Sequence, residues 1–302
     1  MTEAQKGILA LLAACTVWGL SPLYYKALAD VPALEVLSHR TLWSLLIFGA
    51  LMAAQGQLGA LAPLFRRPQI WRVLVAALMI SLNWYSYIHA IQTGHGVEAS
   101  LGYYVFPLVA VLLGMIAFGE RLSKGQGVAV GLAALAVGCL TYGLGVTPWL
   151  SLALAVTFGV YAMVKRQIAG PAMATVTAEV LLLAPLALLW LAHLPQGGHF
   201  NGSVPTAALL AFTGIITAVP LMLFSYAARR VSMATFGLTQ YLNPTLQFLC
   251  ATMIFAEPFS RWHLLAFALI WLALAVYSLD TWRADRLRRA SARADTSGST
   301  LT

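Results

Sequence analysis

Charged side chains are scarce in this sequence. Aspartate, glutamate, lysine and arginine make up 9% of its 302 residues, whereas an average soluble chain carries about 25%. With 18 basic and 10 acidic residues, the chain has too few charges to cover the surface of a soluble globule of this length. It is also 60% hydrophobic, with a mean hydropathy of +0.80. These figures argue against a soluble enzyme or a disordered chain, and they predict a protein that lies in the lipid bilayer.

Cysteine is scarce too. Cys15, Cys139 and Cys250 lie far apart, each within an apolar run. No pair of them has the spacing of metal ligands, so we expect them to pack as small apolar side chains. The sequence also lacks a His-Glu-x-x-His motif and paired carboxylates within its apolar runs. We therefore expect no catalytic residues, no metal and no cofactor, and we predict that the chain is not an enzyme.

Long apolar runs divide the chain into ten segments that are long enough to cross a bilayer. A helix needs about 20 residues to cross the hydrocarbon layer. Residues 125–164 and 180–228 contain no charged residue and are each long enough for two crossings, with glycine and proline marking the break. We predict an all-α integral membrane protein with ten transmembrane helices, at approximately residues 7–28, 35–54, 71–93, 97–118, 125–143, 148–166, 173–193, 206–228, 233–256 and 261–281.

Lysine and arginine collect at one set of ends of these segments. With the N-terminus in the cytoplasm, 15 of the 18 basic residues lie on the cytoplasmic side, and only Lys26, Arg40 and Arg261 lie opposite. Cytoplasmic loops of membrane proteins carry such an excess of basic residues. The distribution predicts a multi-pass protein of a bacterial-type inner (plasma) membrane with both termini in the cytoplasm.

The C-terminal residues, 283–302, form a basic tail that ends in serine, threonine and glycine. A net charge of +8 and such a tail can indicate nucleic-acid binding. Basic residues beside a membrane, however, commonly face anionic lipid headgroups. We expect a disordered cytoplasmic tail, the lipid bilayer as a partner and no nucleic acid.

The two halves of the chain repeat a pattern. Leu101-x-x-Tyr104-x-x-Pro107 in the fourth segment returns as Leu238-x-x-Tyr241-x-x-Pro244 in the ninth. This is the pattern of a duplicated five-helix unit, with the first unit at residues 1–145 and the second at 146–282. Because five is odd, the second unit enters the membrane from the other face. Inverted repeats are typical of transporters that work by alternating access around a site near the middle of the membrane.

Several motifs resemble those of a known family. They are residues 18–26 (WGLSPLYYK), Pro107 with residues 119–123 (GERLS), and Pro244 with residues 256–257. On these motifs the chain resembles the EamA-type transporters of the drug/metabolite transporter (DMT) superfamily, in particular the RarD branch and the YddG-like amino-acid exporters. The resemblance implies a basket of ten helices around a central cavity. It also implies a cargo of small metabolites, often amino acids, that are usually exported.

Polar and aromatic side chains at membrane depth are the candidates for a substrate site. Such groups are costly against lipid and face protein or water. Aromatic rings with a few amides and hydroxyls, and without a central carboxylate, favour a neutral or zwitterionic solute over a cation. The predicted substrate-binding residues are Trp18, Ser21, Tyr24, Ser81, Tyr85, His89, Tyr103, Tyr104, Phe158, Tyr161, Gln240 and Asn243.

One stripe of amides lies on the ninth segment. Gln240, Asn243 and Gln247 share a helical face, and Pro244 removes one backbone donor beside them. The stripe either lines a cavity and binds a zwitterion or joins neighbouring helices by hydrogen bonds. The sequence leaves both interpretations open.

Ionisable residues lie toward the ends of the segments. Glu120 and Glu257 are placed to cap the N-terminus of a neighbouring helix, and Glu179 is placed to pair with Lys165 or Arg166. The outer ends of the first four segments carry a further group that forms an ion-pair latch, a proton path or a static network. Its members are Lys26, Glu35, His39, Arg40, His89 and Glu98.

These features together predict a secondary transporter that exports amino acids, hydrophobic and aromatic ones included, by alternating access. The first alternative is an exporter of drugs or other amphipathic metabolites. The alternative outside transport is a channel or membrane scaffold. The expected partner is a small-molecule substrate, and the chain is expected to be a monomer, with a dimer as the alternative.

Overall fold

The fold is helical throughout the part of the chain that we describe. A computed structural model describes all residues except 120–121, 145–147, 232 and 299–302, and it contains no strand within the residues described. The predicted cap Glu120 lies outside the described residues. The all-α membrane fold predicted from composition is confirmed. The helices are α1 (Glu3–Gly19), α2 (Ser21–Lys26), α3 (Ala33–Ala54), α4 (Gln69–Gln92), α5 (Gly96–Phe118), α6 (Lys124–Leu144), α7 (Trp149–Lys165), α8 (Ala172–Ala192), α9 (Val204–Ala228), α10 (Met233–Gln240), α11 (Leu242–Leu249) and α12 (Arg261–Gly298), with the short helices η1 (Leu58–Phe65), η2 (Pro195–Gly197), η3 (His199–Asn201) and η4 (Cys250–Ile254).

Each predicted span coincides with a helical stretch. Within the described ranges, eight stretches are long and apolar enough to cross a membrane, while α7 is apolar but has 17 residues. The ninth predicted span is divided into α10, α11 and the π-helix η4. Pro244 is the third residue of α11, where its missing N–H has no intrahelical partner, so a new helix begins readily there. The count of ten crossings stays a prediction.

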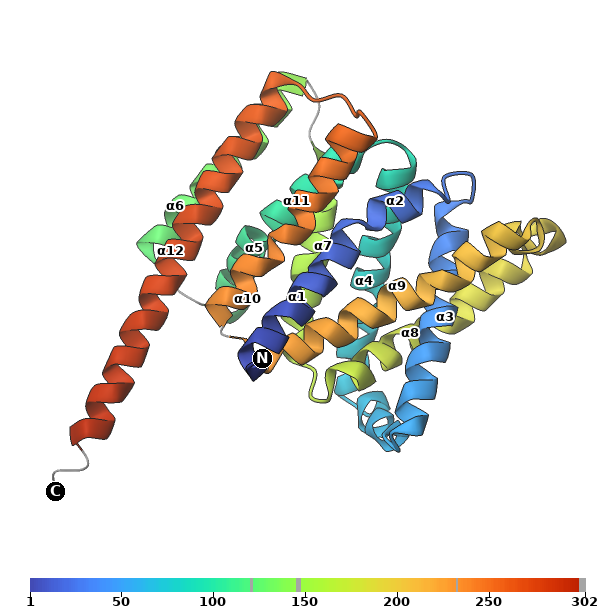
Figure 1. Cartoon of the computed structure of the whole chain (residues 1–302), viewed down its shortest axis with the longest axis horizontal. Coiled ribbons are helices and arrows are strands. Elements are labelled where there is room, and N and C mark those ends of the chain that lie inside the picture. Colours follow the sequence, from blue (N-terminus) through green and yellow to red (C-terminus); the bar gives the residue numbers. More distant parts are fainter. Residues whose placement is uncertain (120–121, 145–147, 232, 299–302) are drawn as a thin grey trace.

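The long helices pack in matched pairs when the predicted spans are numbered from one to ten. α5 packs on α7 (spans 4 and 6), as α1 packs on α11 (spans 1 and 9). The pair α4 and α7 is matched by α9 and α1, and the pair α3 and α9 by α8 and α4. α3 also packs on α8, and α6 on α12. Figure 1 shows α6 and α12 along one edge of the molecule, α3 toward the opposite side, and α8 and α9 running from the middle of the molecule toward that side.

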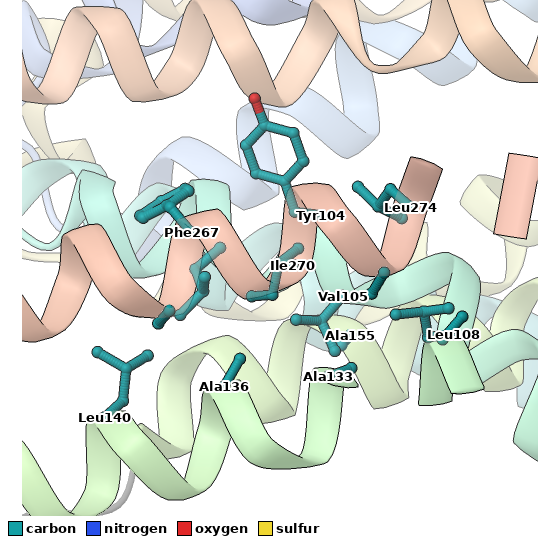
Figure 2. Packing of buried hydrophobic residues seen from close by; sticks show 14 of the residues in the cluster. Tyr104, Val105, Leu108, Ala133, Ala136, Leu140, Ala155, Phe267, Ile270 and Leu274 are labelled. Carbon is teal, nitrogen blue, oxygen red and sulfur yellow. The ribbon is translucent and has the colours of Figure 1, made fainter. Parts of the chain in front are cut away.

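The largest apolar cluster joins α5, α6 and α12. Leu108 of α5, Ala136 of α6 and Ile270 of α12 are among its fully buried members. Tyr104 lies at the edge of this cluster, and its hydroxyl group points away from the side chains of α6 (Figure 2). Small alanine side chains on α6 allow the backbones of α6 and α12 to approach closely. Membrane helices commonly pack through such small residues, because lipid provides no hydrophobic driving force for their association.

Two backbone features match between the halves. Gly119 and Ala256, which stand 137 positions apart like the paired tyrosines, both have a left-handed backbone, with φ of 65° and 51°. Glycine adopts this conformation freely, whereas an L-residue pays about 1–2 kcal/mol because its Cβ approaches the backbone. The second half therefore keeps the turn of the first half with a less suitable residue.

The C-terminal segment differs from the expectation. The sequence favours a disordered tail at 283–302, but the backbone of α12 continues as a helix to Gly298. Its alanine, arginine and leucine residues have high helix propensity, which explains the continuation. Figure 1 shows this part of α12 projecting past the other helices.

Candidate substrate-binding site

A buried polar cluster lies where α2, α3, α4, α5 and α7 meet. Its residues are Ser21, Tyr25, Arg40, Asn83, Tyr87, Tyr103 and Thr157. We refer to these seven residues as the central cluster. Three of them, Ser21, Tyr103 and Arg40, come from different helices of the first half, whereas Thr157 comes from the second half.

Asn83 of α4 is the hydrogen-bonding centre of this cluster. Its side chain is fully buried, and its Nδ2 donates to the Leu154 carbonyl at 2.9 Å and to Thr157 Oγ1 at 3.0 Å, both on α7. Its Oδ1 accepts from the Tyr103 hydroxyl at 2.9 Å. Because a buried amide is stable only when it is hydrogen-bonded, these contacts fix α4, α5 and α7 relative to one another.

Tyrosine rings connect the rest of the cluster. The Tyr87 hydroxyl lies 3.0 Å from Ser21 Oγ. The Tyr87 ring makes edge contacts with Tyr25 and Tyr103, with centroids 5.9 and 5.6 Å apart. Tyr103 in turn meets Phe158 of α7 at 5.8 Å. Hydroxyl groups and ring faces are thus brought together at membrane depth, as a site for an amphipathic solute requires.

Arg40 brings a positive charge to this cluster. The residue is 6% exposed, its Nη1 donates to the Tyr25 hydroxyl at 2.8 Å, and its guanidinium lies 3.8 Å from the centre of the Trp84 ring. Its Nε is buried without a hydrogen-bond partner. Within the described residues, no carboxylate forms an ion pair with Arg40.

A second polar group lies between α7 and α8. Lys165 Nζ forms an ion pair with Glu179, and the Tyr161 hydroxyl donates to Glu179 Oε2 at 3.2 Å. Glu179 is 1% exposed. The prediction that Glu179 pairs with a basic residue of the sixth span is confirmed. Phe158 stacks on Tyr161 at 5.9 Å and so links this group to the central cluster.

Tyr104 lies apart from the central cluster, although it follows Tyr103 in sequence. Its hydroxyl lies 2.6 Å from Thr245 Oγ1 of α11, and its ring meets Phe267 of α12. It borders a pocket of about 290 Å³ between α5, α11 and α12, which is mostly apolar. The lining residues are Tyr104, Tyr241, Thr245, Trp271, Leu274, Ala275 and Ser278.

Two predicted site residues, Tyr85 and His89, lie on an exposed face of α4. Tyr85 is 36% exposed and stacks on the exposed His89, with centroids 6.0 Å apart. They continue an exposed apolar stripe that includes Leu78 and Leu82. An apolar stripe with aromatic and polar residues at its end is typical of a lipid-facing surface that reaches the headgroup region. Ser81 is half-buried.

The remaining predicted residues lie around α1 and α11. Trp18 packs on Phe224 of α9, and the Tyr24 hydroxyl donates to the Leu209 carbonyl. Gln240 is half-buried on α10. Within α11, Asn243 Oδ1 accepts from Gln247 Nε2 at 2.9 Å.

Gly19 is the point of closest approach between α1 and α11. A Cβ atom at this position would lie 2.7 Å from the Leu246 Cβ and 3.1 Å from the Asn243 carbonyl. Asn243 and Gln247 therefore lie at a tight helix crossing, but their hydrogen bond lies within α11 and Gln247 Oε1 is buried without a partner, so both interpretations of the amide stripe stay predictions.

The ionisable residues near the outer ends do not pair with one another in the described structure. Glu35 accepts hydrogen bonds from the backbone N–H and Nδ1 of His199, at 2.6 and 2.8 Å. His39 stacks on Phe200, and Lys26 lies over the Phe255 ring. A single latch built from these residues is therefore not formed; the contacts instead join the first half to loops of the second.

Glu257 caps α5. Its two carboxylate oxygens accept from the backbone N–H groups of Gly96 and Val97 at 2.9 and 2.8 Å. These are unpaired donors at the positive end of the helix, where a carboxylate is stabilising. The predicted capping role of Glu257 is confirmed.

Comparison with known proteins gives the family. A profile of the EamA-like transporter family matches residues 5–142. A Pseudomonas aeruginosa protein described as an uncharacterized transporter is 43% identical over 93% of this chain and 96% of its own. The RarD protein of Escherichia coli is 38% identical over 92% of this chain and 95% of its own. The chain belongs to the EamA-like transporter family.

Within this family the chain is RarD-like, and its fold is shared with a solved structure. One crystal structure superposes with a TM-score of 0.61 over 93% of this chain and 99% of its own, at 21% identity, which shows the fold alone. The family is one of membrane transporters, and this EamA-like protein is therefore a multi-pass membrane transporter.

Sequence reasoning missed five residues of the central cluster. Tyr25, Arg40, Asn83, Tyr87 and Thr157 were not among the predicted substrate-binding residues. Asn83 and Tyr87 are four positions apart and share a helical face, a signal that was available in the sequence. The polar residues Ser81, Tyr85 and His89 on the neighbouring face outnumbered them.

Proposed function

We propose that this EamA-like transporter is a secondary transporter that exports amino acids, hydrophobic and aromatic ones included, by alternating access. The observation that carries the proposal is the central cluster, a buried group of hydroxyls, one amide and tyrosine rings shared by helices of both halves. Polar groups buried at membrane depth are costly and mark the paths of substrates.

The matched helix pairs support the mechanism. The proposed units at 1–145 and 146–282 are related by an inverted repeat. In such a pair, a contact between two helices of different units implies a second contact between the equivalent helices, unless the two helices are themselves equivalent. The most extensive contacts between the long helices of the two units follow this rule, whereas the smaller contact of α5 with α12 has no such counterpart among the principal contacts. Two units with similar packing can exchange inward-open and outward-open arrangements with little difference in energy, which is the physical basis of alternating access.

Ring chemistry supports the cargo. Tyr87, Tyr103 and Phe158 present edges and faces at centroid distances of 5.6–5.8 Å from one another along the cluster. Such rings favour flat or apolar side chains, while hydroxyls and amides hydrogen-bond the backbone groups of a zwitterion.

The direct test is counterflow. Purified protein in liposomes is given a panel of labelled amino acids, with and without a pH gradient. We expect saturable uptake of at least one hydrophobic or aromatic amino acid, and competition by unlabelled solute. Lack of saturable flux for every amino acid would refute the cargo, and conductance without saturation would favour a channel.

Amphipathic drugs form the second arm of this test. A relative from Pseudomonas aeruginosa that is 33% identical over 97% of this chain is described as the chloramphenicol-sensitive protein RarD. Saturable flux of chloramphenicol without flux of amino acids would replace the proposed cargo by a drug-like solute.

The orientation follows from the basic residues. We propose that both termini face the cytoplasm of an inner membrane, because Arg66, Arg67 and Arg72 and the basic end of α12 then lie on one side. Reporter fusions at residue 302 and in the loop 195–203 should report cytoplasmic and external locations respectively. The opposite result would reverse the direction assigned to transport.

A further inference from the structure

Arg40 lies about two helical turns inside the outer end of α3. α3 has 22 residues and is therefore about 33 Å long, and Arg40 is about 10 Å from its beginning. A guanidinium at this depth is costly unless its environment provides compensation, and ionisable residues within membrane helices commonly belong to a solute path.

The protein provides only part of that compensation. Guanidinium has five N–H donors. One nitrogen, Nη1, donates to the Tyr25 hydroxyl, and the Trp84 ring covers one face of the planar group at 3.8 Å. Stacking on a ring leaves the N–H edge of the guanidinium free, and Nε on this edge is buried without a partner.

No negative charge is available to Arg40 from the buried acids. The three buried acidic side chains in the described structure have other partners. Glu35 is bound to the histidine of η3, Glu179 to the lysine at the end of α7, and Glu257 to the backbone at the start of α5. The cation in the central cluster is therefore left for a group that is not part of the chain.

We propose that Arg40 binds the carboxylate of the transported solute. This inference rests on the proposed function and deepens it, because it names the group of the solute that is recognised. A carboxylate accepts two parallel hydrogen bonds from the edge of a guanidinium, which gives both affinity and orientation. Trp84 and Tyr25 hold the guanidinium in place, and the rings of Tyr87 and Tyr103 lie beside the position that the rest of the solute occupies.

Arg40 is closed off in this conformation, which fits a site that opens alternately. α3 packs on α8 and α9, which belong to the second half. The proposal requires that a movement of the second half relative to α3 uncovers the guanidinium edge. The arginine would then exchange its solute with one side of the membrane at a time.

The first experiment uses the unmodified protein. Binding of labelled L-phenylalanine and L-leucine to the purified transporter is measured in competition with the free amino acids and with their primary amides, which lack the negative charge. We expect the amides to compete about 10- to 100-fold more weakly, the range for loss of a charge-assisted hydrogen bond. Equal competition by acid and amide would overturn the assignment.

The second experiment changes the arginine. Arg40→Met should weaken binding of the acid about 10- to 100-fold and bring the affinities of acid and amide together. Arg40→Lys keeps the charge but not the planar fork, so it should retain part of the preference. Arg66→Gln, on the exposed residue that follows η1, is the matched control and should bind like the unmodified protein.

The outcomes separate the two proposals. Saturable amino-acid flux with no preference for acid over amide overturns the role of Arg40 and leaves the proposed function intact. Absence of saturable flux for all amino acids refutes both. A lowered melting temperature of Arg40→Met with an unchanged acid-to-amide ratio would show that Arg40 only supports the fold. Where that variant does not fold, the acid and amide comparison on the unmodified protein decides the question.

Discussion

The two halves of the chain treat a buried cation in different ways. In the second half, Lys165 is neutralised by Glu179 on the adjacent helix. In the first half, Arg40 meets a tyrosine hydroxyl and a tryptophan ring. Lys165 and Tyr25 are 140 positions apart, the same offset that relates Gly159 to Gly19, so the proposed repeat would give the two groups related positions.

This difference separates a structural role from a binding role. A buried ion pair is complete without a ligand, and removing either partner leaves an uncompensated charge. A buried cation with neutral neighbours has no counter-charge in the protein. Its removal therefore abolishes a desolvation cost in the folded state, but it also removes the partner of a negatively charged solute group. The comparison therefore predicts opposite consequences for the two sites.

The largest effect is expected at the ion pair. Glu179→Gln leaves Lys165 without a counter-charge, and we expect a loss of about 2–3 kcal/mol in the free energy of unfolding. This loss is smaller than the about 3–5 kcal/mol of a fully buried pair because the Lys165 side chain is 22% exposed. Unfolding in mixed micelles measures the loss. The double variant Lys165→Met with Glu179→Leu should recover most of it, and an equal loss in single and double variants would contradict the pairing argument.

The next largest effect is an increase in the free energy of unfolding, at the turn that contains Ala256. Ala256 keeps the left-handed backbone that Gly119 has in the first half. Ala256→Gly should raise the free energy of unfolding by about 1 kcal/mol, because glycine adopts this conformation without strain. Gly119→Ala is the reciprocal control and should lower it by a similar amount. If both variants change stability in the same direction, the two turns are not equivalent.

A smaller change in stability is expected at the unpaired cation. Arg40→Met removes a buried charge that has no counter-ion and keeps an unbranched chain beside Trp84, so the free energy of unfolding should change by less than about 1 kcal/mol. The same micelle unfolding experiment tests this value. A loss as large as that of Glu179→Gln would remove the distinction between the two halves.

The smallest effect is expected on the outer face of α4. Tyr85→Leu replaces an exposed residue next to an apolar stripe, so stability should change by less than about 0.5 kcal/mol and the rate of amino-acid flux should stay the same. Asn83→Leu, on the buried face of the same helix, is the contrasting variant and should reduce flux. Reduced flux in Tyr85→Leu would return this residue to the substrate site.

Much of the fold follows from the sequence because charge and length are strong signals in a bilayer. The apolar runs, the glycine and proline breaks and the paired motifs around Tyr104 and Tyr241 locate the helices closely. The roles of Glu257 as a helix cap and of Glu179 as an ion-pair partner were also predictable, because each has few backbone N–H groups or basic side chains within reach.

The orientation of helix faces could not be read in the same way. In a soluble protein the apolar face of a helix points to the core, but lipid tails are as apolar as a leucine side chain. The stripe through Leu78, Leu82 and Tyr85 therefore looks no different from a buried one, and only packing shows that Asn83 and Tyr87 point inward. The basic end of α12 is a second feature that composition did not indicate. Its composition suggests a disordered tail, whereas the helix propensity of its residues extends α12 to Gly298.

The cap on α5 has a consequence for how the molecule can move. Glu257 belongs to the second half, yet its carboxylate holds the first two N–H groups of a first-half helix. This end of α5 and the chain beyond η4 therefore travel as one piece. If the halves rock against each other as proposed, we expect the pivot to lie near this cap and the opposite end of α5 to move furthest.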